Sequence, residues 1–487
     1  MPSIKKNLFY QSSYQLLIML IPLILAPYTS RVLGAENIGV YSFTFSVATY
    51  FIFFAALGIN HHGSRTVAAV RDDGEKLDKT FGELLFLQLC ISCFVFVVYI
   101  IFLFFGAGEL RLIFAFQAIA VLSAALDISW LFKGLEQFKL LVIRNAVIRI
   151  IMVACVFMFV KNEGDLWKYT LIIASGTFAT QAVIWVFVRK FITFKGFSAL
   201  TRSGVASHIK PLLVLFIPVL AASVHSIMAK IILGIMTMSA DKAQLGFFSN
   251  SEKIILIPVG FITAFGAIMI PRIASLGGNE SEQQRLTLVS MKYVMLLAFA
   301  MTFGIAAIAG GFAPLFFGEE FRDCGILITV LCLMVPFMAF SNVIAAQFLI
   351  PASKDKAYTA GTVAGAVLNI TANLILIPHY QALGAAMSAV IAEAFRCVLF
   401  TLAARKHLPV LTYIKNSFFF ISAGALMFLT VRYAGFLLGE TVFSILVQVA
   451  SGMVFYLGIS AVWLYITKDK FFIDNMRRIL RIKKLGA

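Results

Sequence analysis

Long apolar runs recur along the whole chain, and short polar segments separate them. A helix needs about 20 apolar residues to cross the hydrocarbon core of a bilayer. The runs of this length therefore predict an all-α, polytopic membrane protein of about 14 transmembrane helices. The predicted spans are 13–33, 39–60, 80–105, 111–132, 143–160, 168–189, 211–236, 245–271, 288–311, 325–349, 358–378, 383–403, 413–434 and 441–466.

A short internal repeat relates span 1 to span 7 and span 2 to span 8. The segment 16–23 (LLIMLIPL) matches 212–219 (LLVLFIPV), and the following span opens with 39–42 (GVYS) in one case and 246–249 (GFFS) in the other. Both members of a pair would start on the same side of the membrane, so the repeat is parallel. Transporters with parallel repeats hold substrate between two halves and rock one half against the other.

The repeat predicts two pseudo-symmetric six-helix lobes followed by two extra helices. We expect a first lobe at 1–190, a cytoplasmic connector at 191–210 and a second lobe at 211–404, with the extra helices at 413–466. The remaining segment, 467–487, is basic and apolar at helical spacing, which is typical of a helix lying on the inner leaflet.

Composition and charge agree with a membrane protein and fix an orientation. Hydrophobic residues make up 61% of the chain and charged residues 13%, with a formal net charge of +17. Most of the 40 Lys and Arg residues fall in alternate connections, which the positive-inside rule assigns to the cytoplasm. Both termini are therefore predicted to be cytoplasmic, and the excess charge is explained without nucleic acid. The Cys and His residues form no metal-ligating pattern, and no cofactor is expected.

Four short segments follow the order seen in one family of transporters. They are 30–34 (SRVLG) with 39–42, then 130–138 (WLFKGLEQF), 350–354 (IPASK), and 384–387 (GAAM) leading to Glu393. Together they resemble the polysaccharide-transporter branch of the multidrug/oligosaccharidyl-lipid/polysaccharide exporters, which contains the Wzx-like O-antigen flippases. The resemblance implies a transporter, not an enzyme, of the bacterial inner membrane. Its implied substrate is an undecaprenyl-pyrophosphate-linked oligosaccharide, with membrane lipids and polysaccharide polymerase or export machinery as partners.

Such a substrate requires cations along its path, because bare transfer of a pyrophosphate through hydrocarbon is prohibitive. A charged residue at the centre of a transmembrane helix costs about 2.5–3.5 kcal/mol and is a functional candidate by default. We expect Arg31, Lys230 and Lys253 to bind the pyrophosphate, with Asn250 and His225 beside them. The alternatives are an interfacial anchor for Arg31, a snorkelling side chain for Lys230, and a pair between Lys253 and Glu252.

Two further charged pairs are expected to be structural. Asp127 and Arg149 lie in neighbouring spans at similar depth, and Arg396 follows Glu393 by three positions on one helix face. Glu393 could instead titrate during ion coupling.

Two other functions remain as rivals to a flippase. A drug exporter of the same superfamily would favour acidic groups in its cavity, whereas cations predominate here. A membrane polymerase or ligase usually carries a large external catalytic loop, and every predicted external loop is short. The chain has no G-x-x-x-x-G-K-[ST] motif, so it has no nucleotide-binding P-loop of its own.

Overall fold

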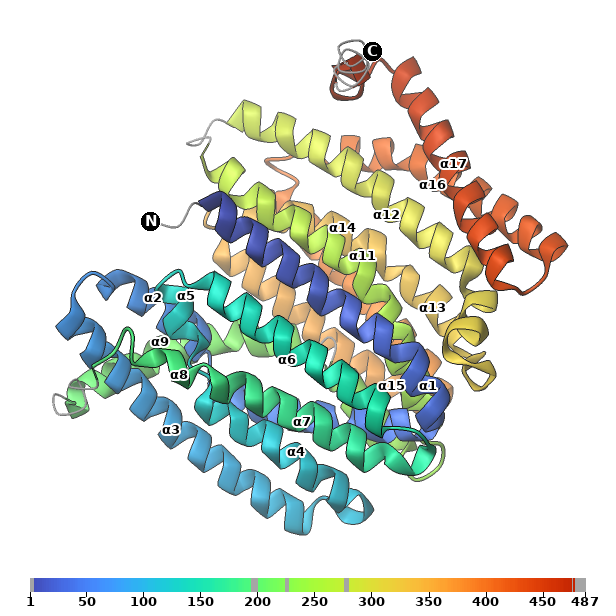
Figure 1. Ribbon diagram of the computed structural model, residues 1–487. Helices are drawn as coiled ribbons and strands as arrows, with labels where there is room; N and C mark the ends of the chain where they lie inside the picture. Colours follow the sequence, from blue (N-terminus) through green and yellow to red (C-terminus); the bar gives the residue numbers. More distant parts are fainter. Residues whose placement is uncertain (1–3, 194–199, 224–226, 276–279, 475, 478–487) are drawn as a thin grey trace, which may run out of the picture. The chain divides into compact units, whose positions relative to one another are not determined.

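The computed structural model describes residues 4–193, 200–223, 227–275, 280–474 and 476–477. Within these ranges the ordered elements are helices, with no strand, as the sequence predicts (Figure 1). Eleven of the described segments are long and apolar enough to cross a membrane. The prediction of an all-helical, multi-span membrane protein is therefore confirmed.

Two of these eleven segments are far longer than one crossing requires. Helix α1 (Ile4–Ala56) contains Gly34 at φ 76° and ψ 169°, and α15 (Asp355–Ala404) contains Gln381 at φ 49° and ψ −124°. A straight helix of 50 residues would extend about 75 Å, more than twice the hydrocarbon core. These breaks fall between the predicted spans 1 and 2 and between spans 11 and 12. Predicted span 7 lies across α9 (Arg202–Ser223) and α10 (Ala229–Thr237) and the undescribed residues between them, so the count of 14 stays a prediction.

Contacts divide the chain into two compact units, Met1–Ser249 and Asn250–Ala487. Besides α1, α9 and α10, unit 1 contains α2 (Ile59–Val70), α3 (Gly74–Phe105), α4 (Arg111–Ser123), α5 (Ser129–Gly134), α6 (Phe138–Phe159), α7 (Leu166–Val183), α8 (Trp185–Val188) and the start of α11 (Ala243–Ala274). Within this unit α9 packs against α2 and α3, and α10 packs against α1. The two lobes inferred from the repeat stay a prediction.

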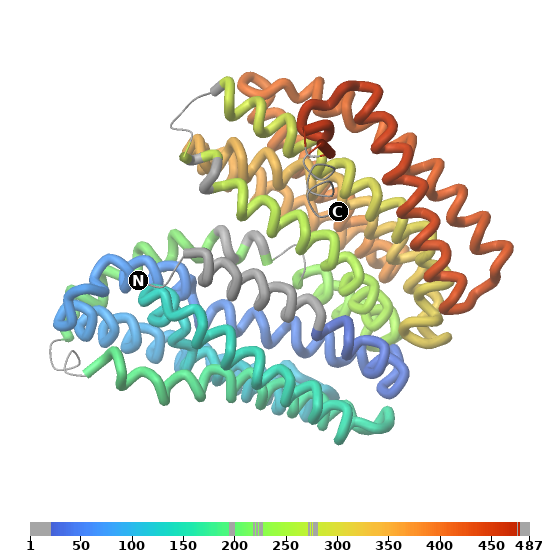
Figure 2. The backbone as a smooth tube through the Cα atoms, turned by 45° about the horizontal axis from the view of Figure 1, so that its top comes forward, coloured from blue at the N-terminus to red at the C-terminus, as the bar shows by residue number. Residues whose placement is uncertain are grey.

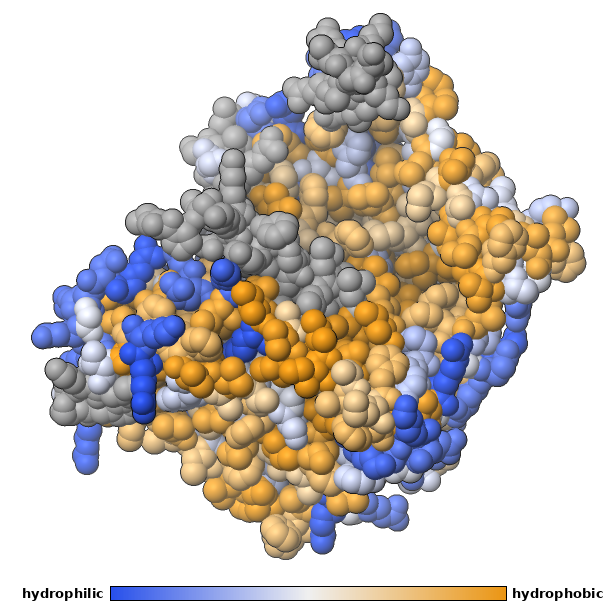
Figure 3. Space-filling model, viewed as in Figure 1, coloured by the Kyte–Doolittle hydropathy of each residue, from blue (hydrophilic) through white to orange (hydrophobic). Residues whose placement is uncertain are grey.

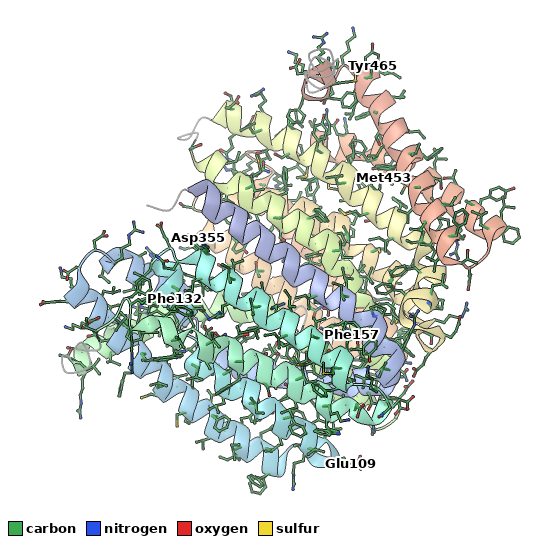
Figure 4. The ribbon with its side chains drawn as sticks, in the orientation of Figure 1. Glu109, Phe132, Phe157, Asp355, Met453 and Tyr465 are labelled. Carbon is green, nitrogen blue, oxygen red and sulfur yellow. The ribbon has the colours of Figure 1, made fainter. Side chains whose placement is uncertain are left out.

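Unit 1 has an apolar outer band between two polar ends. Figure 3 shows hydrophobic side chains over α3, α4, α6 and α7, with hydrophilic residues gathered at both ends of these helices. In Figure 4, Phe132 on α5 marks one end, and Glu109 and Phe157 mark the other. This distribution is the one that a bilayer imposes on a bundle of spanning helices.

The structure ends the helix of predicted span 4 earlier than the expected residue 132. The chain leaves helical geometry at Asp127, where ψ is 92°, and resumes as the short α5. Gln88 Nε2 donates to the carbonyl oxygens of Ala124 and Asp127 at 2.8 and 2.9 Å, and the Asp127 side chain accepts from the Ser129 amide at 3.0 Å. These side chains satisfy the backbone groups that the break exposes, which hydropathy alone does not reveal.

The two copies of the repeat meet in a reciprocal contact inside unit 1. A Cβ at Gly39 would overlap the carbonyl oxygen of Lys242, and a Cβ at Gly246 would overlap that of Ala35. Ser42 Oγ also donates to Ser249 Oγ at 2.9 Å. Positions 35, 39 and 42 correspond to 242, 246 and 249 at one offset of 207 residues, the offset that aligns 39–42 with 246–249, so the contact has the form of a two-fold interface.

Unit 2 is built around α12 (Glu280–Phe317). This helix packs against α13 (Cys324–Cys332), α14 (Met334–Ile344), α16 (Val410–Leu438) and α17 (Val442–Ile466), and its course beside α16 and α17 is visible in Figures 1 and 2. A π-helix at Ala345–Leu349 follows α14. The predicted spans 9, 10, 13 and 14 fall on these elements.

Asp469, in the segment after α17, accepts hydrogen bonds from two residues of α12. Its carboxylate accepts from Lys292 Nζ at 2.5 Å, from the Tyr293 hydroxyl at 3.0 Å and from the Phe472 amide at 2.9 Å. Burial raises the pKa of the Asp469 carboxyl, but these hydrogen bonds outweigh it and leave the pKa below its ordinary value.

The reciprocal glycine contact predicts that Gly39→Ala destabilises the protein. Its added methyl group has no space against backbone, and overpacking of this kind costs about 1–3 kcal/mol. Thermal unfolding of the detergent-solubilised protein measures the loss. Gly458→Ala on α17 is the matched control, since a Cβ there meets no atom within 4 Å. Equal unfolding temperatures for the two variants would contradict the contact.

Candidate functional site

Arg31 lies at one end of unit 1, three residues before the Gly34 break. The segment is held there because the Tyr28 hydroxyl donates to the carbonyl oxygen of Val160 at 2.6 Å and Asn37 Nδ2 donates to that of Glu163 at 3.1 Å. Thr29 and Ser30 are buried, whereas Arg31 is exposed. This position fits both readings of Arg31, the interfacial anchor and the substrate ligand.

Lys230 lies on the side of α10 that faces α1. Gly234 follows it by four residues, and a Cβ at Gly234 would overlap the ring of Phe43 on α1. Residues four apart share one face of a helix, so Lys230 is on this packed face. Its side chain is half-buried. This placement favours a role inside the protein over a side chain that snorkels outward along lipid. His225 lies outside the described residues.

Lys253 is held by the buried Asn250 on α11. Lys253 Nζ donates to Asn250 Oδ1 at 2.8 Å, and Asn250 is 0% exposed. The neighbouring Ser251 hydroxyl approaches the carbonyl oxygen of Cys324 on α13 at 3.4 Å, which fixes this turn of α11 in unit 2. Glu252 is half-buried. The amide oxygen thus orients the ammonium group through a charge-assisted hydrogen bond.

The two expected structural pairs differ in outcome. Arg396 Nη2 lies 2.6 Å from Glu393 Oε2, and Glu393 is only 2% exposed. Asp127 instead accepts from Asn60 Nδ2 at 3.2 Å and from the Ser129 amide. Among the ion pairs of the described residues none joins Asp127 to Arg149, because the break after α4 commits the carboxylate to the backbone.

Comparison with known sequences identifies the family. The profile of the polysaccharide biosynthesis protein family matches residues 4–277, more than half of the chain. The chain belongs to this family. Two relatives, in Shigella dysenteriae and Escherichia coli (strain K12), carry the provisional name O-antigen transporter. They are 23% and 22% identical over 389 and 394 residues, 80% of this chain in each case and 96% and 94% of the relatives.

Solved structures of two other transporters share the fold. The lipid II flippase MurJ in an inward closed conformation has a TM-score of 0.76 at 14% identity, covering 94% of this chain and 98% of its own. An inward-facing multidrug resistance MATE family transporter of the MOP superfamily has a TM-score of 0.62 at 15% identity, covering 82% and 97%. At these identities the likeness concerns the fold alone.

One stretch that carries the resemblance to this polysaccharide biosynthesis family, 130–138, is structural in this chain. Trp130 is fully buried, and its Nε1 donates to Gln88 Oε1 at 3.0 Å. A Cβ at Gly134 would overlap Val67 on α2, so α5 and α2 pack closely. Arg71 Nη1 lies 2.6 Å from Glu136 Oε1 and closes the turn after α5. These residues build the polar end of unit 1.

Sequence reasoning missed a group of buried amides in unit 2. Asn369 and Asn373 on α15 are both 0% exposed, and Asn373 Nδ2 donates to Asn369 Oδ1 at 2.9 Å. The remaining amide groups, Asn369 Nδ2 and Asn373 Oδ1, have no protein partner. Buried polar atoms of this kind usually hold water or a ligand. Their i,i+4 spacing within an apolar span is the signal that could have found them.

Gln347 is a second buried amide that the sequence analysis did not select. It is 0% exposed at the middle of the π-helix Ala345–Leu349, and neither side-chain atom has a protein partner. π-helical turns are frequent at functional sites. Directly after the π-helix, the Lys354 amide donates to the carbonyl oxygen of Leu349 at 2.8 Å.

The Glu393–Arg396 pair predicts a non-additive response to substitution. Arg396→Met leaves a buried carboxylate without its cation, which costs about 3–5 kcal/mol, whereas Glu393→Gln with Arg396→Met removes both charges and recovers much of that loss. Thermal unfolding of the single and double variants measures this coupling. Additive losses would mean that the two groups act independently.

Proposed function

We propose that this protein is a flippase for lipid-linked oligosaccharide. It moves undecaprenyl-pyrophosphate-linked repeat units from the inner to the outer leaflet of the bacterial cytoplasmic membrane by alternating access. The observation that carries the proposal is membership of the polysaccharide biosynthesis family, together with two relatives named as O-antigen transporters over 80% of the chain. The fold shared with a lipid II flippase supports it.

The placement of the cations supports an anionic substrate. Lys230 faces α1, and Lys253 is oriented by a buried amide, so neither side chain is left to lipid. A pyrophosphate can enter a membrane protein only where fixed positive charge and polar groups replace its hydration. The sugar would travel with the pyrophosphate along this polar path, while the polyprenyl chain stays in the bilayer.

A drug or small-molecule exporter is the second candidate, since MATE transporters share the fold. The family membership and the cationic candidates favour the flippase. A polymerase or ligase of the same pathway is the third candidate, and the leaflet on which substrate accumulates separates it from a flippase. Polymer export machinery would be a partner of the flippase in the same membrane, with both termini of this chain in the cytoplasm.

Depletion of the protein should cause lipid-linked repeat units to accumulate on the inner leaflet. A flippase delivers its substrate to enzymes on the far side, so its loss stops the unit before the crossing. Access of a membrane-impermeant glycosidase or lectin, in intact and in opened spheroplasts, measures the leaflet. Accumulation on the outer leaflet would instead identify a polymerase or ligase.

Lys253→Ala should reduce polymer export by at least about 10-fold, because a hydrogen bond to a charged group contributes about 1.5–3 kcal/mol. Lys253→Arg should retain more export than Lys253→Ala, since it keeps the charge. Lys356→Ala is the matched control, because Lys356 is an exposed cation at the start of α15. Export is measured as surface polymer per unit of membrane-inserted protein. Equal losses in the Ala and Arg variants would argue against a simple countercharge.

A further inference from the structure

Three titratable side chains form a continuous chain at the polar end of unit 1. His62 on α2, His208 on α9 and Glu83 on α3 come from three helices that pack together in Figure 1. His62 Nε2 lies 2.8 Å from His208 Nδ1, and His208 Nε2 lies 3.3 Å from Glu83 Oε2. The predicted topology places this end of the unit in the cytoplasm.

Burial increases from His62 toward Glu83. His62 is half-buried, beside the exposed His61, whereas His208 and Glu83 are 8% and 6% exposed. Glu83 Oε1 accepts no hydrogen bond, and its nearest cation is Lys79 Nζ at 4.0 Å. A Cβ at Gly204 on α9 would overlap this oxygen, so α9 lies directly against the carboxylate. A buried carboxylate oxygen without a donor is costly when ionised and much less so when protonated.

The geometry fixes the direction of both hydrogen bonds. An ionised Glu83 can only accept, so His208 Nε2 must carry a proton and donate it. In a neutral His208 the other nitrogen, Nδ1, is then an acceptor, which requires a proton on His62 Nε2. The remaining nitrogen, His62 Nδ1, is the acceptor at the less buried end of the chain.

We propose that Glu83, His208 and His62 form a proton-binding site that is filled through the two imidazoles. A proton from water adds to His62 Nδ1, the His62 Nε2 proton passes to His208 Nδ1, and the His208 Nε2 proton passes to Glu83 Oε2. The product is a neutral carboxylic acid that donates to His208 Nε2, while His208 Nδ1 donates to His62 Nε2. Both hydrogen bonds persist with reversed direction, and the net charge of the three groups changes from −1 to 0.

Proton binding at this site acts on the attachment of α9. The ionised carboxylate makes a charge-assisted hydrogen bond with His208 on α9, and this attraction weakens when Glu83 becomes neutral, whereas Lys79 lies on α3 beside Glu83. Two other nearby carboxylates are engaged elsewhere, Asp78 with Thr193 and Glu136 with Arg71. The further charged groups on the helices packed here are Glu75 and Lys76 on α3 and the cations Arg65, Lys133, Arg202 and Lys210.

Infrared difference spectroscopy on the purified full-length protein in lipid nanodiscs tests the site. Lowering the pH should produce a carboxylic-acid C=O band that is absent in Glu83→Gln and retained in Glu109→Gln. Glu109 is an exposed carboxylate at the opposite end of unit 1 from α5 (Figure 4). Identical spectra of the wild type and Glu83→Gln would overturn the proposal.

The relay is tested by the rate at which this band appears after a pH jump. His208→Gln and His62→Gln should each slow it by at least about 10-fold, a loss that a purely structural role would not cause. Unchanged rates in both variants would overturn the relay. Gly204→Ala provides a second test of the site. Its added methyl group displaces the Glu83 carboxyl group without removing it, so the frequency of the C=O band should shift. None of these measurements needs a transported substrate, so their outcome is independent of the flippase proposal.

Discussion

The cost of moving a charge out of water governs the polar chemistry of this protein. A membrane chain cannot leave an ionised group at depth without a partner, so each such group must be paired, oriented or titrated. The structure pairs Glu393 with Arg396, orients the ammonium group of Lys253 with an amide, and joins Glu83 to two hydrogen-bonded imidazoles. The same cost is why a pyrophosphate carrier would need fixed cations along its path.

The sequence predicted the helices well because hydropathy is a local property of the chain. The breaks at Gly34 and Gln381 lie between predicted spans, where the apolar runs are interrupted. The early end of α4 could not be predicted, since it depends on Gln88, a residue about 40 positions away that donates to the backbone there. Secondary structure that is stabilised by distant side chains leaves no signal in a local pattern.

The candidate site was predictable residue by residue but not as a set of contacts. A charge in an apolar span is visible in the sequence, so Lys230, Lys253 and the Glu393–Arg396 pair were selected. The predicted pairing of Asp127 with Arg149 was wrong. It was inferred from opposite charge alone, whereas the side chain that contacts Asp127, Asn60, is uncharged. The contact between His62 and His208 could not be predicted, since His208 lies in the segment expected to be a connector. Buried amides such as Asn369 carry no charge and were overlooked.

The reciprocal contact of Gly39 and Gly246 bears on how such a chain could have arisen. A self-complementary surface of this kind is what holds two identical subunits together about a two-fold axis, where one substitution is felt twice. Once both copies are joined in a single polypeptide, a change in one glycine alters only one side of the contact. Duplication and fusion thus allow the two copies to diverge in sequence while the contact between them is retained. Ala35 and Lys242, which occupy equivalent positions, illustrate such a divergence.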